Sequence, residues 1–247
     1  MIKISFFLLC SILLAAVTSS FATAGPADYV YTPMVELGER EIDMKFGSSS
    51  LPNGIQSQAT GIGFGYGATE YWFTEVAFKY KSNDGKDVSQ AEWENKFQLT
   101  EIGEYAVDVG LITELEAPLS ANEPWGAKVG GLFQTELSKV QMNGNLLLKR
   151  DFGLSGQTFF TKLVYQLQAK YRLQPEFEFG VQGFGDMGKW NDWSKQSNQA
   201  HSFGPAVFGK LNLGNLRFIK YNAAWLFAAS RNAPGNTFRM QMEYEFY

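Results

Sequence analysis

The feature that most constrains this chain is a two-residue alternation of apolar and polar side chains over long stretches. In residues 163–173 apolar and aromatic residues occupy the odd positions, while glutamine, lysine and arginine occupy most of the even ones. Residues 72–80, 92–99, 105–115 and 238–246 alternate in the same way. Period 2 places each set on its own face of a β-strand. The chain is therefore predicted to be all-β.

Seven weaker stretches of the same kind fill the gaps between these five, which gives twelve strands. They span residues 39–47, 56–66, 125–136, 139–150, 176–187, 199–213 and 217–229. Longer connections, predicted after the odd-numbered strands, alternate with tight ones: 48–55, 81–91, 117–124, 151–157, 188–198 and 230–236 against 67–70, 100–104, 137–138, 174–175 and 214–215. This alternation predicts an antiparallel up-and-down barrel with short periplasmic turns, and an even strand number puts both chain ends on the periplasmic side.

The apolar faces are predicted to contact lipid. The clear strands have the 9–11 residues that a tilted strand needs to cross a bilayer, and 15% of all residues are aromatic. A closed barrel is the one sheet that pairs every backbone group in hydrocarbon, so we expect a 12-stranded transmembrane β-barrel. A soluble sandwich remains the alternative, because alternation does not say which face meets water. The expected aromatic girdle consists of Trp72, Tyr80, Trp93, Tyr105, Tyr165 and Tyr171.

The first 24 residues have the pattern of a secretory signal peptide. Lys3 precedes an apolar core, and Ala22-Thr23-Ala24 supplies the small residues that a signal peptidase needs, which predicts cleavage before Gly25. The only cysteine, Cys10, lies within this peptide, so the mature chain would have none. We expect residues 1–24 to be the signal peptide, 25–38 a periplasmic segment and 39–247 the barrel. The expected location is the cell outer membrane.

The polar positions of the strands predict a lumen that carries charges of both signs. The residues expected to line it are Glu75, Lys79, Glu94, Lys96, Asp108, Glu114, Lys128, Gln166, Gln168, Lys170, Arg172, Glu178, Lys220, Arg239 and Glu243. In an open pore these charges would set a field that screens solutes by charge and size. In a plugged barrel, carboxylates and cations would pair across the lumen and close it. The strand number fits both alternatives.

Residues for catalysis or metal binding are scarce, and no enzyme activity, cofactor or metal is expected. The only histidine, His201, directly precedes Ser202, and adjacent strand residues point to opposite faces, so the dipeptide offers no nucleophile–base pair. One histidine without cysteine does not build a transition-metal site, although calcium could bind loop carboxylates such as Asp84 and Asp87. The formal net charge of −4 argues against a nucleic-acid partner.

The signal peptide, the alternation and the aromatic chain end resemble bacterial outer-membrane β-barrel proteins over the whole mature chain. The stretches Ala68-Thr69-Glu70-Tyr71-Trp72-Phe73-Thr74-Glu75 and Trp93-Glu94-Asn95-Lys96-Phe97-Gln98-Leu99 are also similar to the phenol-degradation MetA-pathway family of barrels. This second resemblance implies passage of hydrophobic or aromatic compounds across the outer membrane of a Gram-negative bacterium.

The leading hypothesis is a passive channel for small solutes, with selectivity set by lumen residues. A largely plugged barrel with a structural or surface-interaction role is the first alternative, and the loop at Trp190–Trp193 is its most conspicuous recognition patch. An outer-membrane lipid hydrolase is the third hypothesis. The expected partners are the lipid bilayer and small solutes. The barrel is expected to be monomeric and to be inserted by the barrel-assembly machinery, as its class implies.

Overall fold

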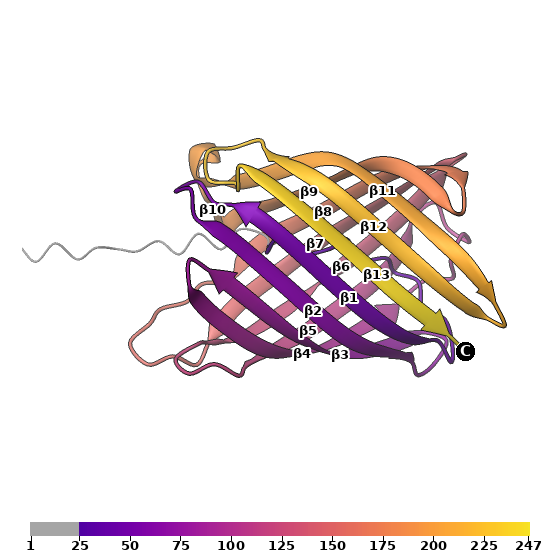
Figure 1. Ribbon diagram of the computed structural model, residues 1–247, viewed down its shortest axis with the longest axis horizontal. Helices are drawn as coiled ribbons and strands as arrows, with labels where there is room; N and C mark the ends of the chain where they lie inside the picture. The colour runs from indigo at the N-terminus through magenta and orange to yellow at the C-terminus, as the bar shows by residue number, and fades with distance from the viewer. Residues whose placement is uncertain (1–24) are drawn as a thin grey trace, which may run out of the picture.

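The computed structural model describes residues 25–247, which form one closed antiparallel sheet (Figure 1). Within this range twelve long strands make up the wall. They are β1 (Arg40–Ser50), β2 (Gln56–Gly67), β3 (Trp72–Asn83), β4 (Lys86–Gln98), β5 (Asp108–Pro118), β6 (Trp125–Leu137), β7 (Val140–Phe152), β8 (Lys162–Gln174), β9 (Phe177–Lys189), β11 (Ala200–Gly214), β12 (Arg217–Ala228) and β13 (Asn236–Phe246).

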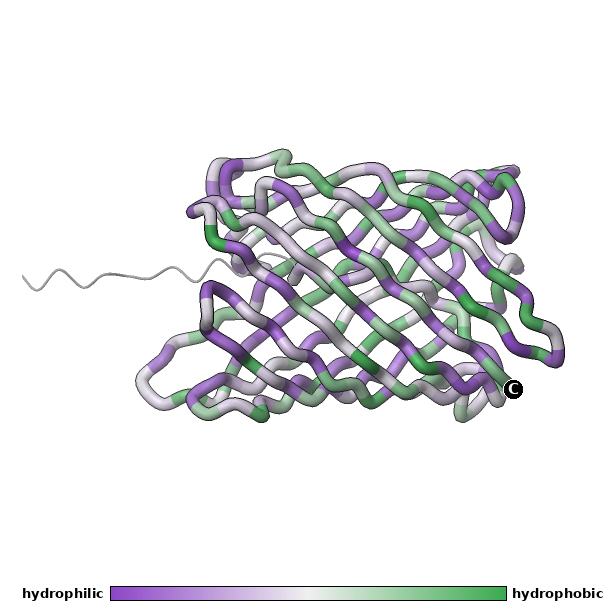
Figure 2. Tube along the Cα trace, viewed as in Figure 1, coloured by the Kyte–Doolittle hydropathy of each residue, from purple (hydrophilic) through white to green (hydrophobic). Residues whose placement is uncertain are grey.

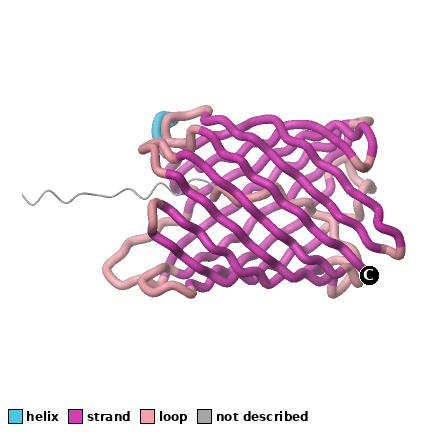
Figure 3. Tube along the Cα trace, viewed as in Figure 1, coloured by secondary structure: helices cyan, strands magenta, loops and turns pink. Residues whose placement is uncertain are grey.

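Each long strand pairs with its neighbours in the chain, and the ring closes where β1 pairs with β13. A two-residue strand, β10 (Asp192–Trp193), extends β9 at one rim, and a short 3₁₀ helix, η1 (Gln196–Asn198), follows it (Figure 3). The rim where β1 begins and β13 ends is called here the C-terminal rim, and the other the opposite rim. The predicted 12-stranded antiparallel barrel is confirmed by this arrangement.

Two connections differ most from their predicted lengths. The β3–β4 connection was expected to span 81–91, but β3 and β4 continue to a two-residue turn at Asp84 and Gly85. Both turn residues have positive φ, 51° and 79°, as a type I′ hairpin requires. Conversely, β5 begins at Asp108 rather than at residue 105, so the connection expected at 100–104 is the longer stretch 99–107.

The wall is apolar outside and polar inside. The change between hydrophobic and hydrophilic residues is visible along strands at the front of the barrel (Figure 2). Phe78, Leu167 and Phe203 are each more than half exposed, whereas Asp43, Gln182 and Glu245 are at most 2% exposed. A soluble sandwich would show the reverse, with apolar side chains buried between two sheets. The described residues form a single closed sheet, so the sandwich alternative is wrong.

Residues 25–39 form a segment that runs through the inside of the barrel to the C-terminal rim, whereas 25–38 were predicted from the sequence to be an N-terminal periplasmic segment. The backbone N–H of Tyr31 donates to Asn145 on β7, and that of Val35 donates to Gln98 on β4. The segment starts near the opposite rim, at Gly25, and leaves the lumen at the C-terminal rim to enter β1. The predicted signal peptide, residues 1–24, lies outside the described residues. Within the described part, no helix is long and apolar enough to cross a membrane.

Candidate functional site: the lumen and the segment inside it

Val30 and Tyr31 bridge the middle of the lumen, because they pack against different parts of the wall. Val30 is buried in an apolar cluster of β9, β11 and β12, whose other members are Phe184, Ala206, Phe208, Ala224 and Leu226. Tyr31 is buried in a second cluster, of β5 to β8, whose other members are Ile112, Leu132, Leu147 and Val164. Consecutive residues of an extended chain point in opposite directions, so one dipeptide reaches both regions.

Polar contacts fix the same stretch in place. Asn145, which is fully buried, accepts from the Tyr31 N–H at 2.9 Å and donates to the Tyr31 carbonyl at 3.1 Å. The Tyr29 hydroxyl donates to Glu94 on β4 at 3.3 Å, and the ammonium of Lys45 on β1 lies 4.0 Å from the centre of the Tyr29 ring. Buried backbone groups need such partners, and a cation over an aromatic face is attracted to it.

Two glycines on the inner wall make room for the segment. A Cβ atom at Gly47 on β1 would collide with the carbonyl oxygen of Pro26, and one at Gly67 on β2 with that of Glu36. Because the colliding atoms belong to the backbone, side-chain rotation does not relieve the clash. The wall sequence is therefore adapted to a chain that runs inside it.

A cavity of about 510 Å³ lies between the segment and the wall, on the side of the C-terminal rim. Carboxylates line it mainly from one arc of the ring, β13 to β4, with Glu41, Glu75, Glu94 and Glu243, while Glu178 lies on β9 outside this arc. Cations line it mainly from the adjoining arc, β8 to β12: Lys170, Arg172, Lys210 and Lys220. Separated charges of this kind set a field across the cavity that a charged or dipolar solute would feel.

Most charges on the inner wall are paired. The Lys45 ammonium lies 2.5 Å from Asp43 and 3.4 Å from Glu75, and that of Lys79 lies 2.5 Å from Glu92. Lys128 pairs with Glu114, and Lys220 with Glu245. Away from bulk water, the attraction within such a pair offsets the cost of desolvation only when the two groups are well placed. Removal of one partner would leave an unpaired buried charge.

All fifteen residues predicted to line the lumen lie on the inner face of the wall. The most buried of them are Glu75, Glu94, Asp108, Glu114, Lys128, Gln166, Glu178 and Arg239. Arg172 reaches the C-terminal rim, where its side chain is 44% exposed and pairs with Glu136. Arg239 is 2% exposed, and within the described residues its Nε and Nη1 have no hydrogen-bond partner.

Residues of the predicted aromatic girdle lie outside the barrel or at its rim, mostly near strand ends. Trp72 begins β3, while Tyr80, Tyr165 and Tyr171 lie within four residues of an end of their strands, and Tyr105 lies just before β5. Trp93 is different: it lies opposite Val76 in the interior of β4, and its indole N–H donates to Thr74.

Three groups of carboxylates on the inner wall are close enough to share a cation: Glu39–Glu41–Glu245, Glu41–Asp43–Glu243 and Glu92–Glu114–Glu116. Each group already has a lysine ammonium beside one member: Lys220 at Glu245, Lys45 at Asp43 and Lys79 at Glu92. Lysine thus supplies positive charge where a metal would. Burial raises the pKa of Glu39, just before β1, to about 7.

His201 and Ser202 point to opposite sides of β11. The His201 ring lies against Tyr165, with Nδ1 2.8 Å from the tyrosine hydroxyl, and its Nε2 is 2.9 Å from Gln199. Ser202 instead lines a small internal cavity. The dipeptide therefore brings no base to the serine, as expected from strand geometry.

Sequence reasoning missed the parts that close the lumen, namely Tyr29, Val30 and Tyr31 and the apolar inner-wall residues they contact. The segment has no periodicity that would reveal its location. The available signal is the glycine at inner positions of β1 and β2, where the segment passes close to the wall.

Together these features define the architecture of an outer-membrane β-barrel: a closed sheet with an apolar exterior and a charged interior. Among solved structures the fold is similar to the COG4313 outer membrane channel from Pseudomonas putida F1, with TM-score 0.56 and 16% identity over 89% of this chain and 97% of that one. It is also similar to the beta domain of the Bordetella autotransporter BrkA, with TM-score 0.51 and 13% identity over 85% of this chain and 99% of that one. At these identities the likeness concerns the fold. No family model and no curated protein match the sequence.

Proposed function

We propose that this protein is an outer-membrane channel for small solutes whose lumen is closed by residues 25–39 and opens when this segment moves. The carrying observation is the charged cavity of about 510 Å³ that ends at the Val30–Tyr31 dipeptide. A solute that enters from the C-terminal rim meets a site of suitable size and polarity but no path onward.

The membrane location is supported by strand length and by the outer surface. The long strands have 11–15 residues, more than the hydrocarbon requires, and large apolar side chains cover their outer positions. The C-terminal rim is proposed to face the periplasm. The resemblance to the MetA-pathway barrels suggests hydrophobic or aromatic solutes, and Phe73 and Phe208 offer aromatic surface in the cavity wall.

A reversible cross-link tests the proposal. The Val35 N–H donates to the Gln98 side chain at 2.9 Å, so cysteines at these two positions are chosen to tie the segment to β4, and a thiol assay first establishes that the disulfide has formed. The expected mature chain has no other cysteine. We expect the Val35→Cys/Gln98→Cys protein to conduct ions in a planar bilayer when it is reduced and to lose that conductance when it is oxidised.

A second pair of cysteines, placed within the wall, controls for the effect of oxidation itself. Gln134→Cys/Asn143→Cys joins directly opposite residues of β6 and β7 and leaves the segment free, so oxidation should not change its conductance. Equal conductance of the fully cross-linked and reduced Val35/Gln98 protein would disprove gating by the segment. Absence of conductance and of solute uptake in every form would disprove the channel.

If no form of the protein conducts ions or takes up solute, the alternative function is that of a closed barrel that acts through its surface. The observation in favour of that alternative is the β9–β11 connection, where Trp190 and Trp193 are both more than half exposed at the opposite rim. Loss of binding to whole cells or to purified envelope components in the Trp190→Ser/Trp193→Ser variant, with unchanged folding, would support it.

A further inference from the structure

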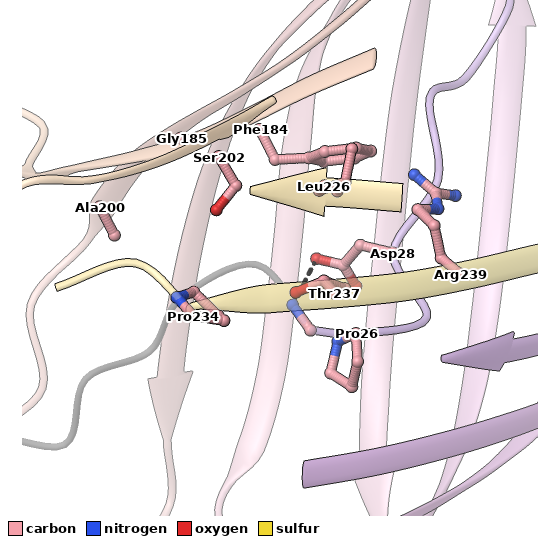
Figure 4. Close-up of a pocket in the computed structure, with 11 residues that line it drawn as sticks. Pro26, Asp28, Phe184, Gly185, Ala200, Ser202, Leu226, Pro234, Thr237 and Arg239 are labelled. Carbon is pink, nitrogen blue, oxygen red and sulfur yellow. Dashed lines mark hydrogen bonds between the residues drawn. The ribbon is translucent and has the colours of Figure 1, made fainter. Parts of the chain in front are cut away.

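The start of the described chain lies in a small cavity at the opposite rim of the lumen (Figure 4). Its walls combine Gly25, Pro26 and Asp28 with residues of β9, β11, β12 and β13, among them Ser202, Thr237 and Arg239. The cavity holds about 20 Å³, room for about one water molecule. A chain end that is placed in such a confined site has few other positions available.

Gly25 and Asp28 bind each other twice. The Gly25 nitrogen donates to Asp28 Oδ2 at 3.0 Å, and the Asp28 N–H donates to the Gly25 carbonyl oxygen at 3.0 Å. The carbonyl of Pro26 fits against Gly47, where any side chain would collide with it. The nitrogen of residue 25 is thus held beside a carboxylate by a closed turn and by the wall.

The predicted signal cleavage would convert the Gly25 nitrogen from an amide into a free α-amine during export. Hydrolysis of the Ala24–Gly25 bond adds water across the amide: the hydroxyl goes to the Ala24 carbonyl, and Gly25 gains a proton and leaves as an amine. At neutral pH the amine takes a further proton to become an ammonium with three N–H donors and a full positive charge. A bond between two full charges then replaces the amide's bond to the Asp28 carboxylate, so Coulomb attraction between opposite charges is added to the hydrogen bond.

We infer that this cavity is the binding site of the chain's own processed N-terminus, in which the Gly25 ammonium forms an ion pair with Asp28, so that signal cleavage completes closure of the lumen. The inference rests on the membrane location that is part of the proposed function and on the predicted signal cleavage before Gly25, and not on conductance. Asp28 also shares the cavity with the guanidinium of Arg239, whose Nε and Nη1 are unsatisfied. One carboxylate thereby lies between the new ammonium and a buried cation.

The test measures the Gly25 amine directly. The protein is expressed with its own signal peptide, and intact mass spectrometry first establishes that the mature chain begins at Gly25. The rate of reductive methylation of the α-amine is then followed against pH by peptide mass spectrometry, which yields its apparent pKa. Asp28→Asn should lower that pKa and speed labelling at neutral pH at least tenfold. Asp87→Asn, an exposed carboxylate near the same rim, should change neither.

An extended chain provides the second comparison. With two alanines placed before Gly25, the ammonium moves out of the cavity, and Asp28→Asn should then have no effect on the labelling of the new α-amine. A start other than Gly25, or an α-amine that responds equally to Asp28→Asn and Asp87→Asn, overturns the inference. None of these readouts depends on channel activity, so a barrel that fails to conduct can still pass this test.

Discussion

At the scale of single residues, Asn145 is the most specific anchor of the segment, because its side chain satisfies both backbone groups of Tyr31. In Asn145→Ala both groups lose their partner in a buried place. Each unsatisfied group costs about 1–3 kcal/mol. We therefore expect a lower urea midpoint of unfolding in detergent and a higher single-channel open probability.

The neighbouring Asn143 is the matched control. It is similarly buried on the same strand, but its amide donates to Gln134 of the wall, and no hydrogen bond joins it to the described segment. Asn143→Ala is expected to lower stability without raising the open probability. If both variants open the channel equally, Asn145 has no special role in closure.

The stability of the folded protein is expected to depend on pH through the carboxyl group of Glu39. Its pKa is raised by burial to about 7 in the folded protein, against 4.5 for the free side chain. The folded state therefore binds a proton more tightly, so this contribution to stability is fully present below pH 4.5 and is lost as pH rises to 7. The loss is on the order of 1–3 kcal/mol. Unfolding by urea at pH 4.5 and 7.5 should show a smaller pH dependence in Glu39→Gln than in the wild type, because the contribution of this one carboxyl is removed.

At the scale of elements, the strands were predictable and the segment was not. Period 2 in stretches such as residues 163–173 arises because each residue meets lipid or lumen, and this pattern correctly predicted the faces of β8. Residues 25–39 meet different wall residues at each step, so no period encodes their position. The β3–β4 hairpin was misjudged because Asp84-Gly85 forms a tight turn within polar residues that resemble a loop.

The close approach of segment and wall can be tested at Gly47. Gly47→Ala would place a methyl group against the Pro26 carbonyl and push the start of the segment away from β1. Overpacking of this kind costs about 1–3 kcal/mol. We expect a lower unfolding midpoint together with larger conductance in bilayers.

Gly144 on β7 controls for the general effect of alanine in a strand. An added Cβ there meets only Leu167 Cδ2, at 3.6 Å, an ordinary contact. Gly144→Ala should leave both conductance and stability close to wild type. A Gly47→Ala protein that behaves in the same way would mean that the segment shifts without cost.

At the scale of the whole molecule, the apolar exterior predicts a dependence on depth in the bilayer. Leu167 and Leu173 lie on the same face of β8 and are similarly exposed, 51% and 53%, but Leu167 is near the middle of the strand and Leu173 near its end. Arginine costs about 2–4 kcal/mol at the bilayer midplane and about 0–1 kcal/mol near the interface.

Equilibrium folding into phosphatidylcholine vesicles measures this difference. Leu167→Arg should destabilise the barrel by several kcal/mol and Leu173→Arg by less than about 1 kcal/mol. Equal, small effects at both positions would place this surface in water and not in lipid.

The seam between β1 and β13 has a consequence for biogenesis. These strands lie at the two extremes of the folded chain, and they are hydrogen-bonded along ten residue pairs. The circle is therefore completed only once the final residues have been delivered. The stretch ahead of β1 leaves the lumen at the C-terminal rim, so it is enclosed either while this seam forms or afterwards, by entry through that rim. Assembly of this protein thus couples the path of one short stretch to the joining of the first and last strands.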